Sequence, residues 1–132
     1  MTKKILLVAG IIGALGIIMD ALGSLYFTEF ISDDELMMFK HGILYQMIHA
    51  LALIGVVFLN RYFKPKYINI IFLMFVAGTI LVSGTLYLMA LSDMFKVDFS
   101  MLRPFTAIGG LLLIVGWISI ASLGINYKSK KR

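Results

Sequence analysis

Four long apolar stretches alternate with short segments that hold nearly all of the charged residues. The stretches run over residues 5–27, 43–59, 68–91 and 105–125. A helix needs about 20 apolar residues to cross about 30 Å of hydrocarbon. Three stretches reach this length, and 43–59 falls short of it. The pattern predicts transmembrane helices.

The second stretch is lengthened by a helix-start signal that precedes it. In Ser32-Asp33-Asp34-Glu35, the Ser32 hydroxyl can accept from the Glu35 amide while the Glu35 carboxylate reaches back. Acidic residues also suit a helix N-terminus. We therefore expect the second helix to begin near Asp33 and end near Asn60. The expected helices are 5–27, 33–60, 68–91 and 105–125.

The composition favours lipid as the solvent of these helices. Hydrophobic residues make up 61% of the 132-residue chain and charged residues 14%, whereas soluble domains average about 45–50% and about 25%. A small soluble domain buries only about two-thirds of its surface, so it could not hide this excess. The expected fold is all-α: an integral membrane four-helix bundle, up-down-up-down, with 1–132 as a single transmembrane domain.

The basic residues predict the orientation in the membrane. Only Lys40, Lys96 and Arg103 lie in the first and third links, together with the acidic residues Asp33, Asp34, Glu35, Asp93 and Asp98. The positive-inside rule then predicts a cell-membrane protein with both termini cytoplasmic. The other nine basic residues lie at the termini and in the middle link: Lys3, Lys4, Arg61, Lys64, Lys66, Lys128, Lys130, Lys131 and Arg132.

Two features leave alternatives open. Lys3, Lys4 and the first apolar run also fit a cleaved signal peptide, with Ala21-Leu22-Gly23 as the cleavage site; the length of the run and its glycine spacing favour a packed helix instead. The link 92–104 alternates apolar and charged residues. It is expected either in the headgroup region or half-buried against the bundle.

Polar residues fall in one layer of the predicted bundle. Asp20 in the first helix and His49 in the second both lie about 10 Å below the outer surface, at 1.5 Å rise per residue, so they could face each other. Tyr45, Gln46 and His49 share one helix face, because helical neighbours are three or four residues apart. The candidate ligand-binding residues are Asp20, Tyr45, Gln46, His49, Ser83, Tyr87 and Thr106.

This layer permits structural and functional interpretations. An intramembrane carboxylate costs about 2.5–3.5 kcal/mol on insertion scales, which makes it a functional candidate. Asp20 could form a proton-accepting pair with His49, a cation site or a headgroup site. It could also hydrogen-bond Gln46 or Tyr87 and hold the first helix to its neighbours.

Several chemistries lack the residues that they need. The chain has no cysteine, which excludes disulfides, thiolate metal sites and a cysteine nucleophile. His41 and His49 lie eight residues apart with no carboxylate in register, so neither a metal nor a cofactor is expected. The basic tail 128–132 is better suited to anionic lipid than to nucleic acid.

The motifs together resemble the YgdD-like, or YwdK-like, family of small bacterial membrane proteins, the domain of unknown function 423. The resemblance implies four membrane helices and motif positions at Gln46, His49, Ser83 and Tyr87, with no established activity. The motifs are Gly13-Ala14-Leu15-Gly16, Tyr45-Gln46-Met47-Ile48-His49-Ala50-Leu51-Ala52, Ser83-Gly84-Thr85-Leu86-Tyr87, Gly109-Gly110 and Gly116-Trp117.

The chain departs from the family pattern at three positions. Leu25 stands where a histidine is usual, Asp20 where a small residue is usual, and Ala107 where a proline is usual. A role that needs two histidines is therefore in doubt here, and the polar function could have moved to Asp20.

Three classes of function follow. The first is a non-enzymatic structural, accessory or membrane-stress factor, with lipids, other membrane proteins or further copies of the chain as partners. The second is a lipid- or cation-binding or transport protein that uses the layer around Asp20 and His49. The third, which we do not expect, is a lipid-modifying enzyme with His49 as base and Asp20 as its orienting partner.

Overall fold

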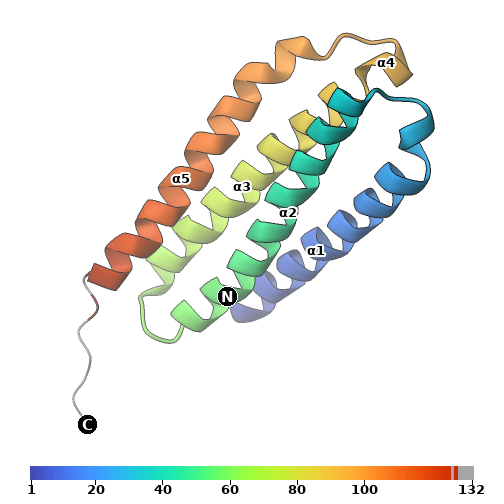
Figure 1. Cartoon of the computed structure of the whole chain (residues 1–132). Helices are drawn as coiled ribbons and strands as arrows, with labels where there is room; N and C mark the ends of the chain where they lie inside the picture. The colour runs from blue at the N-terminus through green and yellow to red at the C-terminus, as the bar shows by residue number, and fades with distance from the viewer. Residues whose placement is uncertain (126, 128–132) are drawn as a thin grey trace.

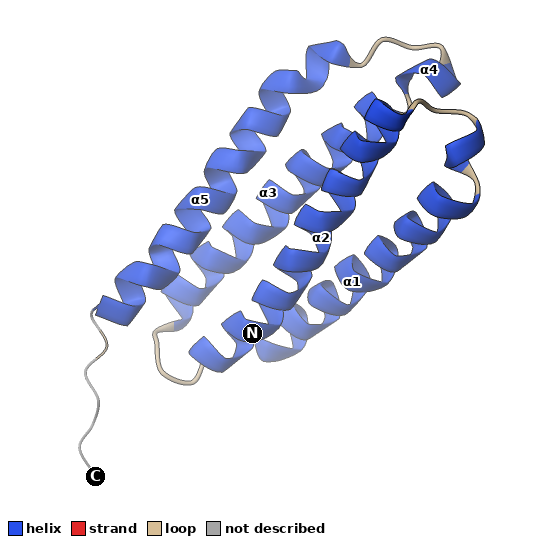
Figure 2. Cartoon of the chain, viewed as in Figure 1, coloured by secondary structure: helices blue, strands red, loops and turns tan. Residues whose placement is uncertain are grey.

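The computed structural model describes residues 1–125 and 127, and this part of the chain is all-α without a strand (Figures 1 and 2). Within it, four helices are long and apolar enough to cross a membrane. They are α1 (Thr2–Leu25), α2 (Asp33–Leu59), α3 (Pro65–Ala90) and α5 (Arg103–Ile125). Three short helices lie in the links: η1 (Phe27–Glu29), α4 (Ser92–Phe95) and η2 (Ser100–Leu102). The predicted all-α membrane bundle is confirmed.

The helix ends follow local capping more closely than the apolar pattern. The Ser32 amide donates to Glu35 Oε2 at 2.8 Å, and Ser32 Oγ accepts from the Glu35 amide at 3.4 Å, so the predicted capping box is present. α3 begins at Pro65, earlier than the expected residue 68, because proline suits the first helical position. α1 ends at Leu25 because the chain turns there into η1.

Each of the four long helices runs antiparallel to the one before it, and α2 and α3 lie at the centre. α1 packs on α2, α2 on α3, and α3 on α5. Figure 1 shows α1 and α5 on the two flanks of this central pair. More of α2 and α3 than of α1 and α5 is buried. The flanking helices therefore present broad apolar faces to lipid.

Two apolar clusters form the interior. The larger holds the fully buried Ile5, Leu53, Ile68 and Phe75, which come from α1, α2 and α3. The smaller surrounds Phe39, near the end of the bundle that carries residues 26–32 and 91–102. We call this end the link end.

The link from α3 to α5 is partly packed and partly exposed. Met94 packs against the smaller cluster, whereas Phe95 and Val97 are exposed. Lys96 adopts a left-handed conformation with φ 55°. The Ser100 amide donates to Asp98 Oδ1 at 2.8 Å, and this hydrogen bond lowers the pKa of that carboxyl. The predicted basic tail 128–132 lies outside the described residues.

Candidate functional site

One buried amide connects three helices at mid-membrane depth. Gln46 on α2 donates through Nε2 to the Ile12 carbonyl oxygen of α1 at 2.8 Å. Its Oε1 accepts from the Tyr87 hydroxyl of α3 at 2.6 Å. Donor and acceptor sides of the amide are thus both used, and an amide buried in lipid needs such partners.

A second link between α2 and α3 depends on a glycine. Ser83 Oγ donates to the Gly42 carbonyl oxygen at 2.7 Å. A Cβ at Gly42 would lie 2.7 Å from Tyr87 Cε1, which is closer than van der Waals packing allows. Gly42 therefore lets Tyr87 approach α2, while Ser83, one turn away on α3, binds the exposed carbonyl. Gln46, Ser83 and Tyr87 form the predicted layer at this interface.

His49 uses both ring nitrogens inside the protein. Its Nδ1 lies 2.7 Å from the Tyr45 carbonyl oxygen, and Trp117 Nε1 lies 3.2 Å from its Nε2. A carbonyl only accepts and an indole N–H only donates, so His49 is neutral with its proton on Nδ1. The ring also meets Phe75 edge-on, with centroids 5.3 Å apart. His49 thus joins α2 to α5.

Asp20 lies away from this network. It is exposed at the edge of the buried face of α1 and lines a cleft with Lys40 and Met47. Among the described residues, no hydrogen bond or ion pair of its carboxylate is found; Ser24 Oγ donates only to its backbone carbonyl, at 2.8 Å. Of the contacts that the sequence left open for Asp20, neither the pair with His49 nor a hydrogen bond to Gln46 or Tyr87 is formed. Two residues at the same depth need not face each other, because the direction of each side chain also depends on how its helix is rotated about its own axis.

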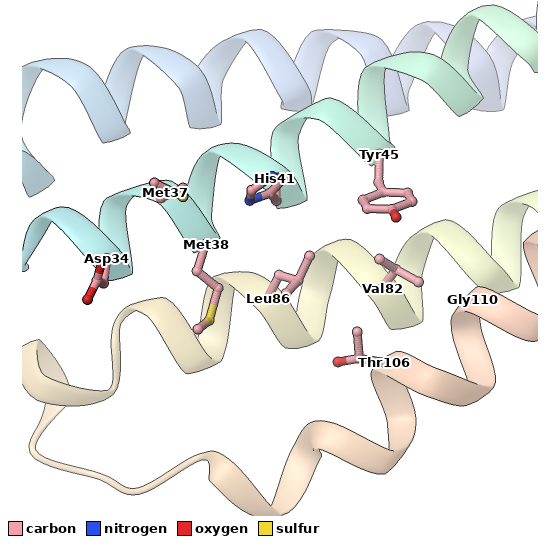
Figure 3. Close-up of a pocket in the computed structure, with 9 residues that line it drawn as sticks. All are labelled: Asp34, Met37, Met38, His41, Tyr45, Val82, Leu86, Thr106 and Gly110. Carbon is pink, nitrogen blue, oxygen red and sulfur yellow. The ribbon is translucent and has the colours of Figure 1, made fainter.

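A groove of about 480 Å³ lies between α2 and α5, with α3 as its floor (Figure 3). It holds the two remaining predicted residues, Tyr45 and Thr106; Thr106 also shares a hydrogen bond with the buried Thr85. We call it the α2–α5 groove, and its lining is Asp34, Met37, Met38, His41, Tyr45, Val82, Leu86, Thr106 and Gly110.

Some residues of these sites were not among the sequence candidates. Asp34 and His41 share a helix face with Tyr45 at spacings of eleven and four residues, a signal that could have identified them. Trp117, which the sequence offered only as part of the Gly116-Trp117 motif, donates to His49 through its indole N–H. The Thr85 hydroxyl donates to the carbonyl oxygen of Leu81, one turn earlier on α3, at 2.6 Å.

The geometry limits the chemistry of the layer. The described residues contain no group of three His, Cys, Asp or Glu side chains able to hold a metal. The base and orienting pair of a lipid-modifying enzyme needs hydrogen-bond reach between its members. His49 is instead hydrogen-bonded to Tyr45 and Trp117, so the His49–Asp20 pair of that third class of function is not formed.

Residues 19–110 match the family model described as "Protein of unknown function (DUF423)". The chain belongs to the DUF423 family. The predicted family resemblance is therefore confirmed. The family match spans α2 and α3 completely, together with Asp20 and the beginning of α5.

Three curated relatives cover much of the chain. The UPF0382 membrane protein YwdK of Bacillus subtilis is 33% identical over 94% of this chain and 98% of its own length. The UPF0382 inner membrane protein YgdD of Escherichia coli K12 is 30% identical over 98% and 96%. A UPF0382 membrane protein of Haemophilus influenzae is 33% identical over 67% and 66%. No solved structure matches the chain. These names and the four apolar helices together identify a multi-pass membrane protein.

Proposed function

We propose that this protein is a non-enzymatic structural or accessory component of the cell membrane. The observation that carries the proposal is that the buried residues of the polar layer, Gln46, His49 and Ser83, are hydrogen-bonded within the chain. Gln46, Ser83 and His49 direct their polar atoms to other helices or to their own backbone. Hydrogen bonds between helices stabilise membrane bundles, whereas a reacting group needs a free atom that faces substrate.

The outer surfaces support an accessory role. Large apolar side chains are exposed along both flanking helices, among them Ile17 and Leu25 on α1 and Leu111 and Ile118 on α5. The links between the spans are short, so most of the described surface faces lipid or other membrane helices. Lateral contact with membrane partners is the interaction that this shape favours.

The experiment compares His49→Ala and Gln46→Leu with wild type in two measurements: the free energy of unfolding in micelles, and the proteins that co-purify after gentle release from the membrane. Both variants should lose stability, because each removes hydrogen bonds and leaves their partners unpaired away from water. His41→Ala is the matched control, since His41 is exposed and makes no hydrogen bond in the described part of the chain. Unchanged stability and unchanged partners in both variants would sink the proposal.

Lipid binding in the α2–α5 groove is a second candidate. Its volume of about 480 Å³ falls in the usual range of ligand pockets, about 300–1,000 Å³. The groove has Asp34 and His41 towards the link end and apolar side chains such as Val82 further along. Gly110→Leu should fill it and abolish a lipid that native mass spectrometry finds on wild type. Retention of that lipid by a folded Gly110→Leu protein would contradict this candidate.

Cation transport through the polar layer around Asp20 and His49 makes a different prediction. It requires flux into vesicles that contain the purified protein and loss of that flux in His49→Ala. The structural role requires no flux. A vesicle assay with K⁺ and H⁺ indicators separates the two.

A further inference from the structure

A second hollow lies on another side of α2, between α1 and α2. It has a volume of about 370 Å³. We call it the α1–α2 cleft, and its lining is Gly16, Ile17, Asp20, Lys40, Ile43, Leu44 and Met47. None of the hydrogen-bonded residues of the polar layer lines it, although Gln46 lies next to the lining residue Gly16.

One carboxylate and one ammonium are the charged groups of this cleft. Asp20 and Lys40 are both exposed, and they form no ion pair with each other in the described structure. Gly16 lets Met47 of α2 pack closely against α1, because a Cβ at Gly16 would lie 2.6 Å from Met47 Sδ. The cleft therefore offers a negative and a positive group above an apolar wall, with neither charge neutralised by the protein.

The two charges lie just below the expected layer of lipid headgroups. Asp20 is little more than one turn before the end of α1, and Lys40 is two turns after the beginning of α2, which is roughly 8 Å and 11 Å along the axes. α2 has 27 residues, so it is about 40 Å long and projects roughly 5 Å beyond each side of the hydrocarbon. The Lys40 stem can extend to the interface, and the shorter Asp20 side chain lies close beneath the headgroups.

We propose that the α1–α2 cleft binds one zwitterionic phospholipid. The Lys40 ammonium donates to the lipid phosphate, and the Asp20 carboxylate accepts from the lipid ammonium. One acyl chain lies along Ile17, Ile43 and Leu44. This goes beyond the accessory role, because it assigns a specific lipid class to a site outside the polar layer.

Charge complementarity selects this occupant over an anionic lipid. A phosphatidylglycerol headgroup satisfies Lys40 but leaves Asp20 without a counter-charge near the hydrocarbon, which is unfavourable. A second copy of the chain could pair Asp20 with the opposite Lys40 in a symmetric contact. The hollow between the two charges favours a headgroup, which can enter it, over the convex surface of a helix.

The test is lipid retention measured by native mass spectrometry. The full-length protein is reconstituted in vesicles with equal amounts of phosphatidylethanolamine and phosphatidylglycerol and then released gently. Wild type should retain phosphatidylethanolamine in preference. Asp20→Asn should lower this retention about threefold to fivefold, the scale of a partly exposed charge pair. Lys40→Gln should lower the retention of both lipids.

Two controls keep the result specific. Asp93→Asn and Lys66→Gln remove exposed charges that do not line the cleft, and they should leave retention unchanged. Thermal unfolding of Asp20→Asn and Lys40→Gln should match that of wild type, since both side chains are exposed. The role of the polar layer is tested at Gln46 and His49, so it can fail independently of this proposal.

Two outcomes overturn the inference. One is equal retention of the two lipids that neither Asp20→Asn nor Lys40→Gln alters. The other is a lipid-free dimer that Asp20→Asn dissociates, which would assign the cleft to a second copy of the chain.

Discussion

At the residue scale, Gln46 shows why a polar side chain is tolerated in the bundle interior. The Ile12 carbonyl and the Tyr87 hydroxyl take up its donor and one acceptor site. Hydrogen bonds between membrane helices contribute about 0.6 kcal/mol on average, with a maximum of about 1.7 kcal/mol. Removing one partner costs more than the average contribution of such a bond, because the other partner stays unpaired in the bundle interior.

A double-mutant cycle measures the Gln46–Tyr87 bond. We expect Gln46→Leu and Tyr87→Phe each to destabilise the protein, by about 1–2 kcal/mol and about 1 kcal/mol. Their effects should couple by about 0.6–1.7 kcal/mol, because the double variant loses one shared bond. Unfolding in mixed micelles gives the free energies, and Tyr62→Phe, at an exposed tyrosine, is the control. Strict additivity would contradict the 2.6 Å hydrogen bond.

The sequence identified most polar residues of this layer but not their pairing. Gln46, Ser83 and Tyr87 were expected together, and they are together. Asp20 was grouped with His49 because both lie at one depth, yet α1 is rotated so that Ile12, Gly16 and Gly23 are buried and Asp20 lies at the edge. Helical periodicity gives the faces of one helix, whereas the choice of partner depends on packing between helices.

At the element scale, glycines set how closely α3 and α5 approach. A Cβ on Gly109 would lie 2.8 Å from Leu81 Cβ and 2.9 Å from the Val82 backbone nitrogen. Across the seam, a Cβ on Gly78 would lie 2.9 Å from the Gly109 carbonyl oxygen. Small residues at a helix interface permit such backbone contact in membranes.

Gly109 and its neighbour Gly110 form a matched pair for testing this seam. We expect Gly109→Ala to destabilise the protein by about 1–3 kcal/mol, the usual effect of overpacking a dense interior, because the backbone of α3 would have to move. Gly110→Ala should be neutral or slightly stabilising, since nothing lies within 4 Å of its added Cβ and alanine favours helix. Unfolding curves of both variants measure the two effects, and equal losses of stability would contradict the close approach of α3 and α5 at Gly109.

The helices themselves were largely predictable as elements. Long apolar runs identified all four spans, and the Ser32–Glu35 capping box gave the beginning of α2. The beginnings of α1, α3 and α5 lie two or three residues before the apolar stretches, whereas α2 and α5 end where their stretches end, at Leu59 and Ile125. The short helices α4 and η2 were not predicted, since their few residues carry no periodic signal.

At the scale of the whole molecule, the chain is a central α2–α3 pair with a helix on each flank. The beginning of α1 also reaches α3, where Lys4 Nζ lies 5.1 Å from the centre of the Phe72 ring. Since the four helices alternate in direction, the links 26–32 and 91–102 lie at one end and residues 60–64 at the other (Figure 1). A single labelling experiment can therefore determine the orientation.

We expect the link end to face outward and residues 60–64 to face the cytoplasm. The reason is that most basic residues lie at the end of the bundle that carries residues 60–64 and the two termini. The chain has no cysteine, so single substitutions can be labelled without background. Thr28→Cys should react with a membrane-impermeant maleimide on intact cells, and Lys64→Cys only after permeabilisation. The reverse pattern would invert the proposed topology.

The sequence by itself determined that this chain forms four membrane-spanning helices, since hydrocarbon admits only segments whose backbone is satisfied internally. It also determined where α2 begins and which polar residues share a helix face. Only the tertiary structure decided that His49 meets Trp117, that Gln46 bridges three helices, and that Asp20 shares a cleft with Lys40. These pairings depend on how far each helix is rotated, and that rotation is set by side chains that pack across interfaces far apart in the sequence.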